Sequence, residues 1–163
     1  MFTRILVPMD FSAPSEAALA CARTVAARFG ASLHLLHVAD DPGRAIWPAE
    51  AFAPEVEGLR EAIIDNSVDR LRDRLQQSDI GAGATAEAWT GAIAPAIVDY
   101  AATRGADLIV MGTHGRGGVS RRLLGSVTER VVRTAPCPVL TIRDSGTGMR
   151  QGLDVMASQA NPR

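Results

Sequence analysis

The sequence contains no lysine, because all 17 of its basic residues are arginine. A Walker-type phosphate loop needs a lysine on the phosphates of its nucleotide. A protein kinase needs a strand lysine, and a Schiff-base enzyme needs a lysine amine. The missing residue type therefore excludes these three classes.

The sequence also has few cysteines, little net charge and no long apolar run. Cys21 and Cys137 are the only cysteines, and neither lies in a Cys-x-x-Cys pair or near a spaced histidine, so we expect neither a disulfide framework nor a metal site. A net charge of −1 gives no overall attraction to nucleic acid or to an anionic membrane. No apolar run approaches the roughly 20 residues of a membrane span. The start of the chain lacks the pattern of a signal peptide, so we expect a cytoplasmic protein.

Short apolar runs and helical periods alternate along the 163 residues. The alternation predicts an α/β fold, with a parallel sheet covered by helices on both faces. Strands are expected at Ile5–Pro8, Ser32–Val38, Ala84–Trp89, Leu108–Met111 and Val139–Ile142, and helices at Ser15–Phe29, Val56–Leu75, Ile93–Ala101 and Val127–Arg133. Residues 144–163 are poor in apolar side chains, so we predict one domain over 1–143 and a flexible tail over 144–163.

Two segments at strand ends contain polar or glycine residues, where ligands bind in open parallel sheets. One is Pro8-Met9-Asp10, and the other runs from Gly112 to Gly118. Gly125-Ser126 then opens the last predicted helix, and Ser126 to Glu129 fits a capping box. Glycines and a helix start together favour an anion site made mainly of backbone amides. The same residues also fit a simple turn, a helix cap and solvated arginines.

The spacing Gly112-x2-Gly115-x9-Gly125-Ser126 resembles the nucleotide-binding signature of the universal stress protein family. The opening stretch from Ile5 to Ser12 resembles that family as well, as do 106–116, 125–131 and 135–140. The resemblance covers about residues 2–143 and implies an ATP-binding, UspA-like member. It also implies a Rossmann-like sheet of strand order 3-2-1-4-5 with ATP at its carboxyl edge.

The resemblance further implies a set of binding residues. Asp10 would bind the ribose or adenine side, Pro8 and Met9 would line the base pocket, and Val38 would meet adenine through its backbone. The phosphate end would be held by Gly112, Gly115, Arg116, Gly125, Ser126 and Val127. ATP would bind with Mg²⁺ or Mn²⁺. Met9 departs from the small polar residue of many relatives, and its longer apolar side chain would tighten the base pocket. The family also implies a homodimer through Val139 to Arg143.

Three functions remain open on this basis. The first is a nucleotide-dependent regulatory or stress-response protein. The second is a slow ATP hydrolase or phosphotransferase, although phosphoryl transfer needs a group that orients the nucleophile, and no convincing base stands out. The third is a dimeric interaction module whose glycine loop is purely structural. His34 and His37 are three residues apart on a strand, so they face opposite sides of the sheet and cannot form a simple metal pair.

Overall fold

The structure is a computed structural model, and it describes residues 1–44, 53–76, 83–113 and 125–143. Its strands are β1 (Arg4–Pro8), β2 (Ser32–Ala39), β3 (Thr85–Thr90), β4 (Leu108–Gly112) and β5 (Val139–Ile142). Its helices are α1 (Ala13–Phe29), the 3-10 turn η1 (Pro42–Arg44), α2 (Ala53–Gln76), α3 (Ile93–Arg104) and α4 (Ser126–Thr134). The predicted tail over 144–163 lies outside the described residues.

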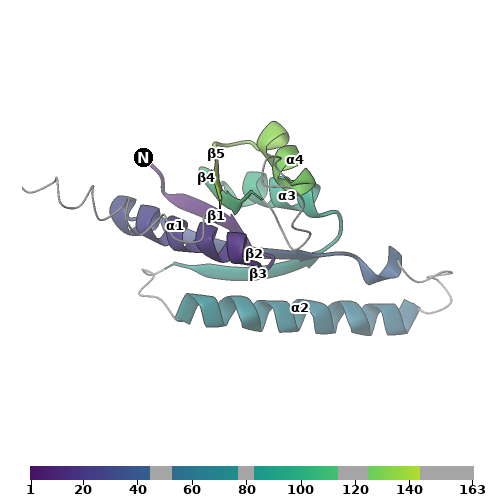
Figure 1. The fold of residues 1–163 in the computed structure, drawn as a ribbon. Helices are drawn as coiled ribbons and strands as arrows, with labels where there is room; N and C mark the ends of the chain where they lie inside the picture. The colour runs from purple at the N-terminus through teal and green to yellow at the C-terminus, as the bar shows by residue number, and fades with distance from the viewer. Residues whose placement is uncertain (45–52, 77–82, 114–124, 144–163) are drawn as a thin grey trace, which may run out of the picture.

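The five strands form one parallel sheet of order β3-β2-β1-β4-β5, as predicted. Figure 1 shows α2 running along one side of the sheet beneath β2 and β3, with α3 and α4 on the other side. The alternation of short strands and helices therefore predicted the fold class and the covering of both faces.

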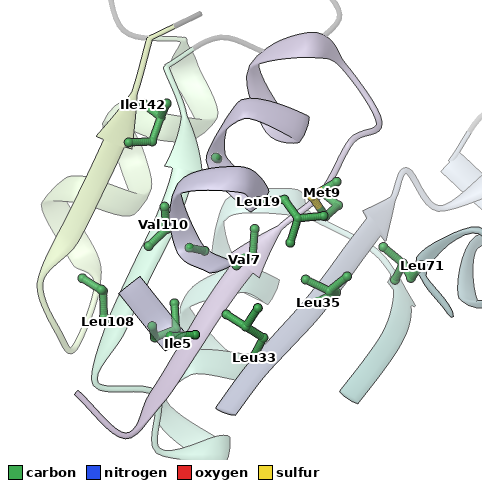
Figure 2. Close-up of a cluster of buried hydrophobic side chains, with 13 residues drawn as sticks. Ile5, Val7, Met9, Leu19, Leu33, Leu35, Leu71, Leu108, Val110 and Ile142 are labelled. Carbon is green, nitrogen blue, oxygen red and sulfur yellow. The ribbon is translucent and has the colours of Figure 1, made fainter. Parts of the chain in front are cut away.

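Each face of the sheet has its own apolar cluster. On one face, side chains of α1 and α2 such as Leu19 and Leu71 pack on Leu33 and Leu35 of β2 (Figure 2). On the other face, α3 and α4 pack on alternate strand residues such as Leu36. Ile5 to Val7 of β1 and Leu108 to Met111 of β4 are buried and apolar because both faces of these strands are covered.

Helix α1 begins at Ala13, two residues before the predicted start at Ser15, and ends at Phe29 as predicted. Ser12 is its N-cap, and the Ser12 side chain accepts a hydrogen bond from the Ser15 amide. Gly30 ends the helix in the left-handed conformation that suits glycine, with φ 68°. The helix predicted at Val56–Leu75 from its apolar period is also present, within α2, although Leu59 keeps 46% of its surface exposed.

Candidate functional site

Both polar strand ends lie at the carboxyl edge of the sheet. β1 and β4 are parallel neighbours, with Ile5 opposite Leu108 and Leu6 opposite Ile109. β1 ends at Pro8 and β4 at Gly112, so the segments that follow both strands leave the sheet on the same side. The two parts of the predicted site are therefore adjacent in the fold, although about a hundred residues separate them in the chain.

The Asp10 carboxylate is tied into the turn that starts α1. Its Oδ1 accepts hydrogen bonds from the Ser12 amide at 3.0 Å and from the Ser12 hydroxyl at 2.5 Å. Ser12 Oγ in turn accepts from the Ser15 amide at 3.4 Å, and Ser15 Oγ donates to the Ser12 carbonyl at 2.9 Å. The side chains of Asp10, Ser12 and Ser15 thus provide hydrogen-bond partners for the first turn of α1.

Phe11 is the one non-glycine residue with positive φ among the described ranges, at 61°. Two other groups contact its ring. The Arg70 guanidinium carbon is 3.6 Å from the ring centroid, and the His37 ring lies 4.9 Å away on centroids, tilted by 41°. Sequence reasoning did not find this cluster, because nothing local predicts a left-handed phenylalanine or a contact with an arginine 59 positions further on.

The Met9 side chain does not line an open pocket. Its side chain is 2% exposed and packs in the α1 and α2 core near Leu19 (Figure 2). Its amide donates to the Leu36 carbonyl at 2.8 Å, and His37 Nδ1 lies 2.6 Å from its carbonyl oxygen. A carbonyl only accepts, so Nδ1 carries the proton in this bond. The unusual methionine is thus a core residue in this structure.

Val38 lies beyond the last paired residue of β1. The β1–β2 ladder ends at Pro8 opposite Leu36, whereas Val38 still pairs with Trp89 of β3. The Leu36 carbonyl points toward β1, where it accepts from Met9. Backbone groups two residues apart on a strand point the same way, so the Val38 backbone faces the side where β1 has ended. This direction suits the backbone role expected for Val38.

Gly112 has a structural reason to be glycine. An added Cβ would lie 2.8 Å from Pro14 Cβ and 2.9 Å from the Pro14 carbonyl carbon, so the first turn of α1 leaves no room for a side chain. The family resemblance implied that this glycine contacts phosphate. Close packing of α1 on the end of β4 already requires it.

The prediction of a capping box from Ser126 to Glu129 at the start of α4 is wrong. Gly125 is the N-cap and Ser126 is already the first helical residue, exposed and without a capping bond. The Glu129 carboxylate pairs with Arg133 at 2.9 Å instead of returning to the helix start. The Gly125 amide donates to the Thr113 carbonyl at 2.8 Å, and Thr128 Oγ1 to the Gly112 carbonyl at 2.9 Å.

The Gly125 N-cap leaves α4 without the side-chain cap that α1 has, because glycine has no side-chain oxygen to accept from the next amides. Its φ of −60° and ψ of 149° are open to any residue, so backbone conformation does not demand glycine there. Amides at the start of a helix and its dipole together attract anions. This helix start is therefore a candidate position for an anionic group.

Other expected residues lie outside the described part of the chain. These are Gly115 and Arg116. Within residues 1–44, 53–76, 83–113 and 125–143, no group of three or more histidine, cysteine or acidic side chains is arranged to hold a metal ion.

His34 faces the opposite, amino edge of the sheet. With Arg4 and Arg104 it lines an open cleft of about 510 Å³. Its ring nitrogens lie 3.3 Å from Ser32 Oγ and 2.8 Å from Thr85 Oγ1. Burial lowers the pKa of His34, and Arg4 lowers it further. The prediction that the two histidines face opposite sides is confirmed, since His37 contacts Phe11 on the other face.

The two cysteines behave as packing residues. Both are free and partly buried, and burial raises the pKa of the Cys21 and Cys137 thiols. A raised pKa keeps a thiol protonated and weakly nucleophilic at neutral pH.

A parallel five-stranded α/β domain with two polar strand ends at one carboxyl edge defines a broad class of ligand-binding folds. The model of the universal stress protein family matches residues 1–143. The chain therefore belongs to the universal stress protein family. Searched over the described residues, no helix is both long and apolar enough to cross a membrane.

Several relatives make the match concrete. Universal stress protein MJ0531 of Methanocaldococcus jannaschii is 34% identical, over 88% of this chain and 83% of its own length. The structure of universal stress protein UspA from Lactobacillus plantarum has a TM-score of 0.75 and 34% identity, covering 87% of this chain and 98% of that one.

Two related structures contain an adenine nucleotide. A universal stress protein in complex with cAMP has a TM-score of 0.61 and 25% identity, covering 86% of this chain and 97% of that one. The universal stress protein from Archaeoglobus fulgidus in complex with dAMP has a TM-score of 0.52 and 25% identity, covering 86% and 98%.

Proposed function

We propose that this protein binds ATP at the carboxyl edge of its sheet and acts as a nucleotide-dependent regulatory or stress-response protein in the cytoplasm. The observation that carries the proposal is the start of α4. There a glycine N-cap leaves the first helical amides without a side-chain cap, directly beside the end of β4. Helix starts of this kind bind phosphate.

The nucleoside end is proposed to lie across the end of β1. Asp10 follows β1, and Val38 directs its backbone toward the space where β1 has ended. A carboxylate accepts hydrogen bonds from ribose hydroxyls, and a strand backbone can pair with the edge of a base. The cAMP and dAMP complexes of related proteins support an adenine nucleotide as the ligand.

The divalent ion is proposed to arrive with the nucleotide. Mg²⁺ keeps several of its waters and usually binds through substrate phosphates plus one or two carboxylates. The three-residue clusters of a protein-only metal site are lacking in the described residues, which fits such an ion. Mg²⁺ or Mn²⁺ would neutralise part of the phosphate charge.

A homodimer through Val139 to Arg143 is also proposed. β5 pairs with β4 on one side and forms the edge of the sheet, and its Leu140 is 38% exposed. An edge strand offers backbone groups to a second strand. Sedimentation of wild type and a Thr141→Pro variant tests this, since proline removes an amide from the edge. A wild-type monomer at micromolar concentration would contradict the dimer.

Calorimetric titration of nucleotide-free protein with ATP and Mg²⁺ tests the ATP proposal, with dAMP as the comparison ligand. We expect micromolar binding of ATP and clearly weaker binding of dAMP, because only ATP has β- and γ-phosphates to place at α4. Equal affinity for both ligands would remove the triphosphate from the proposal. No heat with either would contradict nucleotide binding.

A further inference from the structure

The turn after β1 holds a backbone conformation that its own residue disfavours. Phe11 has φ 61°, and a left-handed backbone crowds a residue with a bulky side chain. Such a conformation persists only where the surroundings hold it, and it occurs often at functional sites. The contacts around the Phe11 ring are therefore expected to fix this turn.

Three elements supply those contacts. Arg70 comes from α2 and places its guanidinium carbon 3.6 Å from the ring centroid, well inside cation–π range. His37 comes from β2 and packs its ring at 4.9 Å. His37 is itself anchored to the strand before the turn, through the 2.6 Å bond between Nδ1 and the Met9 carbonyl.

The position of Phe11 in the chain links this clamp to Asp10. Phe11 is the single residue between Asp10 and Ser12, whose amide and hydroxyl donate to Asp10 Oδ1. Rotation of Phe11 to negative φ would change the path of the chain between donor and acceptor. The carboxylate would then lose the geometry that it has in the clamped turn.

We propose that Arg70 and His37 are positioning residues that clamp Phe11 and so hold the Asp10 carboxylate in place for the nucleoside end of the ligand. Through Arg70, helix α2 controls one half of the site without touching the nucleotide. The inference rests on the proposed function, because it assigns Asp10 to the nucleoside.

The first experiment uses the free protein, so that it does not depend on ligand binding. Arg70→Gln removes the cation, and Arg72→Gln is the matched control, because Arg72 lies on the same helix, is 63% exposed and pairs with Asp69. In amide NMR spectra, Arg70→Gln should shift Asp10, Phe11 and Ser12, and the Ser12 amide should exchange roughly five-fold faster. The control should leave all three unchanged.

The second experiment separates the two ends of the ligand. Arg70→Gln should weaken ATP about five-fold by calorimetry, while inorganic tripolyphosphate, which has no nucleoside, should bind as to wild type. Arg70→Lys keeps a cation and should restore ATP affinity to within about two-fold of wild type.

Each result decides a different claim. Unmoved Asp10 and Ser12 amides in free Arg70→Gln would overturn the clamp, and so would equal losses for ATP and tripolyphosphate, which indicate general damage. If wild type binds neither ligand, the proposed function fails, while the spectra of the free protein still decide whether Arg70 holds the turn.

Discussion

The two helices that begin at the carboxyl edge of the sheet start in opposite ways. At α1, Ser12 caps the helix and Asp10 supports Ser12. At α4, Gly125 provides no side chain, and Ser126 is exposed. Helix starts leave amides that need partners. The start of α1 is satisfied by side chains of its own segment, whereas the N-cap residue of α4 makes no side-chain cap hydrogen bond.

The largest expected effect comes from giving α4 the kind of cap that α1 has. Gly125→Asp should reduce ATP affinity by about 100-fold or more, because the new carboxylate occupies the helix start and repels phosphate. The backbone at 125 accepts any residue, so the melting temperature should stay level or rise slightly. Calorimetry and thermal melting measure both effects.

Gly58→Asp is the matched control for that change. Gly58 lies in α2 with open space around its Cα, and the substitution adds the same charge. It should leave ATP affinity as in wild type. Undiminished binding by Gly125→Asp would show that phosphate does not bind at α4.

The next largest effect is expected at the contact between Gly112 at the end of β4 and Pro14 in the first turn of α1. Gly112→Ala places a Cβ 2.8 Å from Pro14 Cβ and should destabilise the fold by about 2 kcal/mol through overpacking. Gly58→Ala, which meets nothing within 4 Å, should instead stabilise α2 by about 0.5–1 kcal/mol. Urea unfolding compares the two variants, and equal stability would refute the close packing.

A smaller effect tests the caps directly. Ser12→Ala removes the N-cap of α1 and should cost about 1 kcal/mol. Ser126→Ala changes an exposed residue that caps nothing, so unfolding should be close to that of wild type. Chemical denaturation of both variants gives the difference. A comparable loss for Ser126→Ala would restore the predicted capping box.

The smallest effect lies at the amino edge, away from both helix starts. Burial raises the pKa of Asp107, but hydrogen bonds from the Thr3 hydroxyl and the backbone amides of Arg4 and Thr3 outweigh it and lower the pKa overall. A carboxylate with a lowered folded pKa stabilises the fold above its ordinary pKa, and this stability is lost as pH falls through the folded value.

Asp107→Asn should therefore melt below wild type at neutral pH. The difference should shrink as the pH falls below about 4, where Asp107 of the unfolded wild-type chain takes up a proton before the folded carboxylate does. ATP affinity should not change, because the edge is remote from the site. Melting curves from pH 3 to 7 test this, and a pH-independent difference would contradict the role of the charge.

Local patterns were enough to predict most of the fold. Short apolar runs marked buried strands, and the range predicted for α1 ended at the correct residue, Phe29. The capping box failed because the Thr113 carbonyl takes the Gly125 amide and sets the entry of α4 one residue earlier. That contact is tertiary, and the four-residue pattern does not contain it.

The position of the site at one edge of the sheet was predicted, but the contacts that hold its residues in place were not. The two strand ends were correctly brought to one edge. The Phe11 clamp depends on Arg70, and the reason for Gly112 depends on Pro14, both of them contacts between segments far apart in the sequence. Sequence spacing carries no information about such contacts unless a family pattern supplies it.

The packing of Pro14 on Gly112 has a consequence for how relatives are compared. A glycine at this position records how α1 sits on β4, so it should be inherited by members of the family whether or not they bind a nucleotide. A glycine at the position of Gly125 is under no such demand from the backbone. In sorting the family into nucleotide binders and non-binders, position 125 should therefore discriminate and position 112 should not.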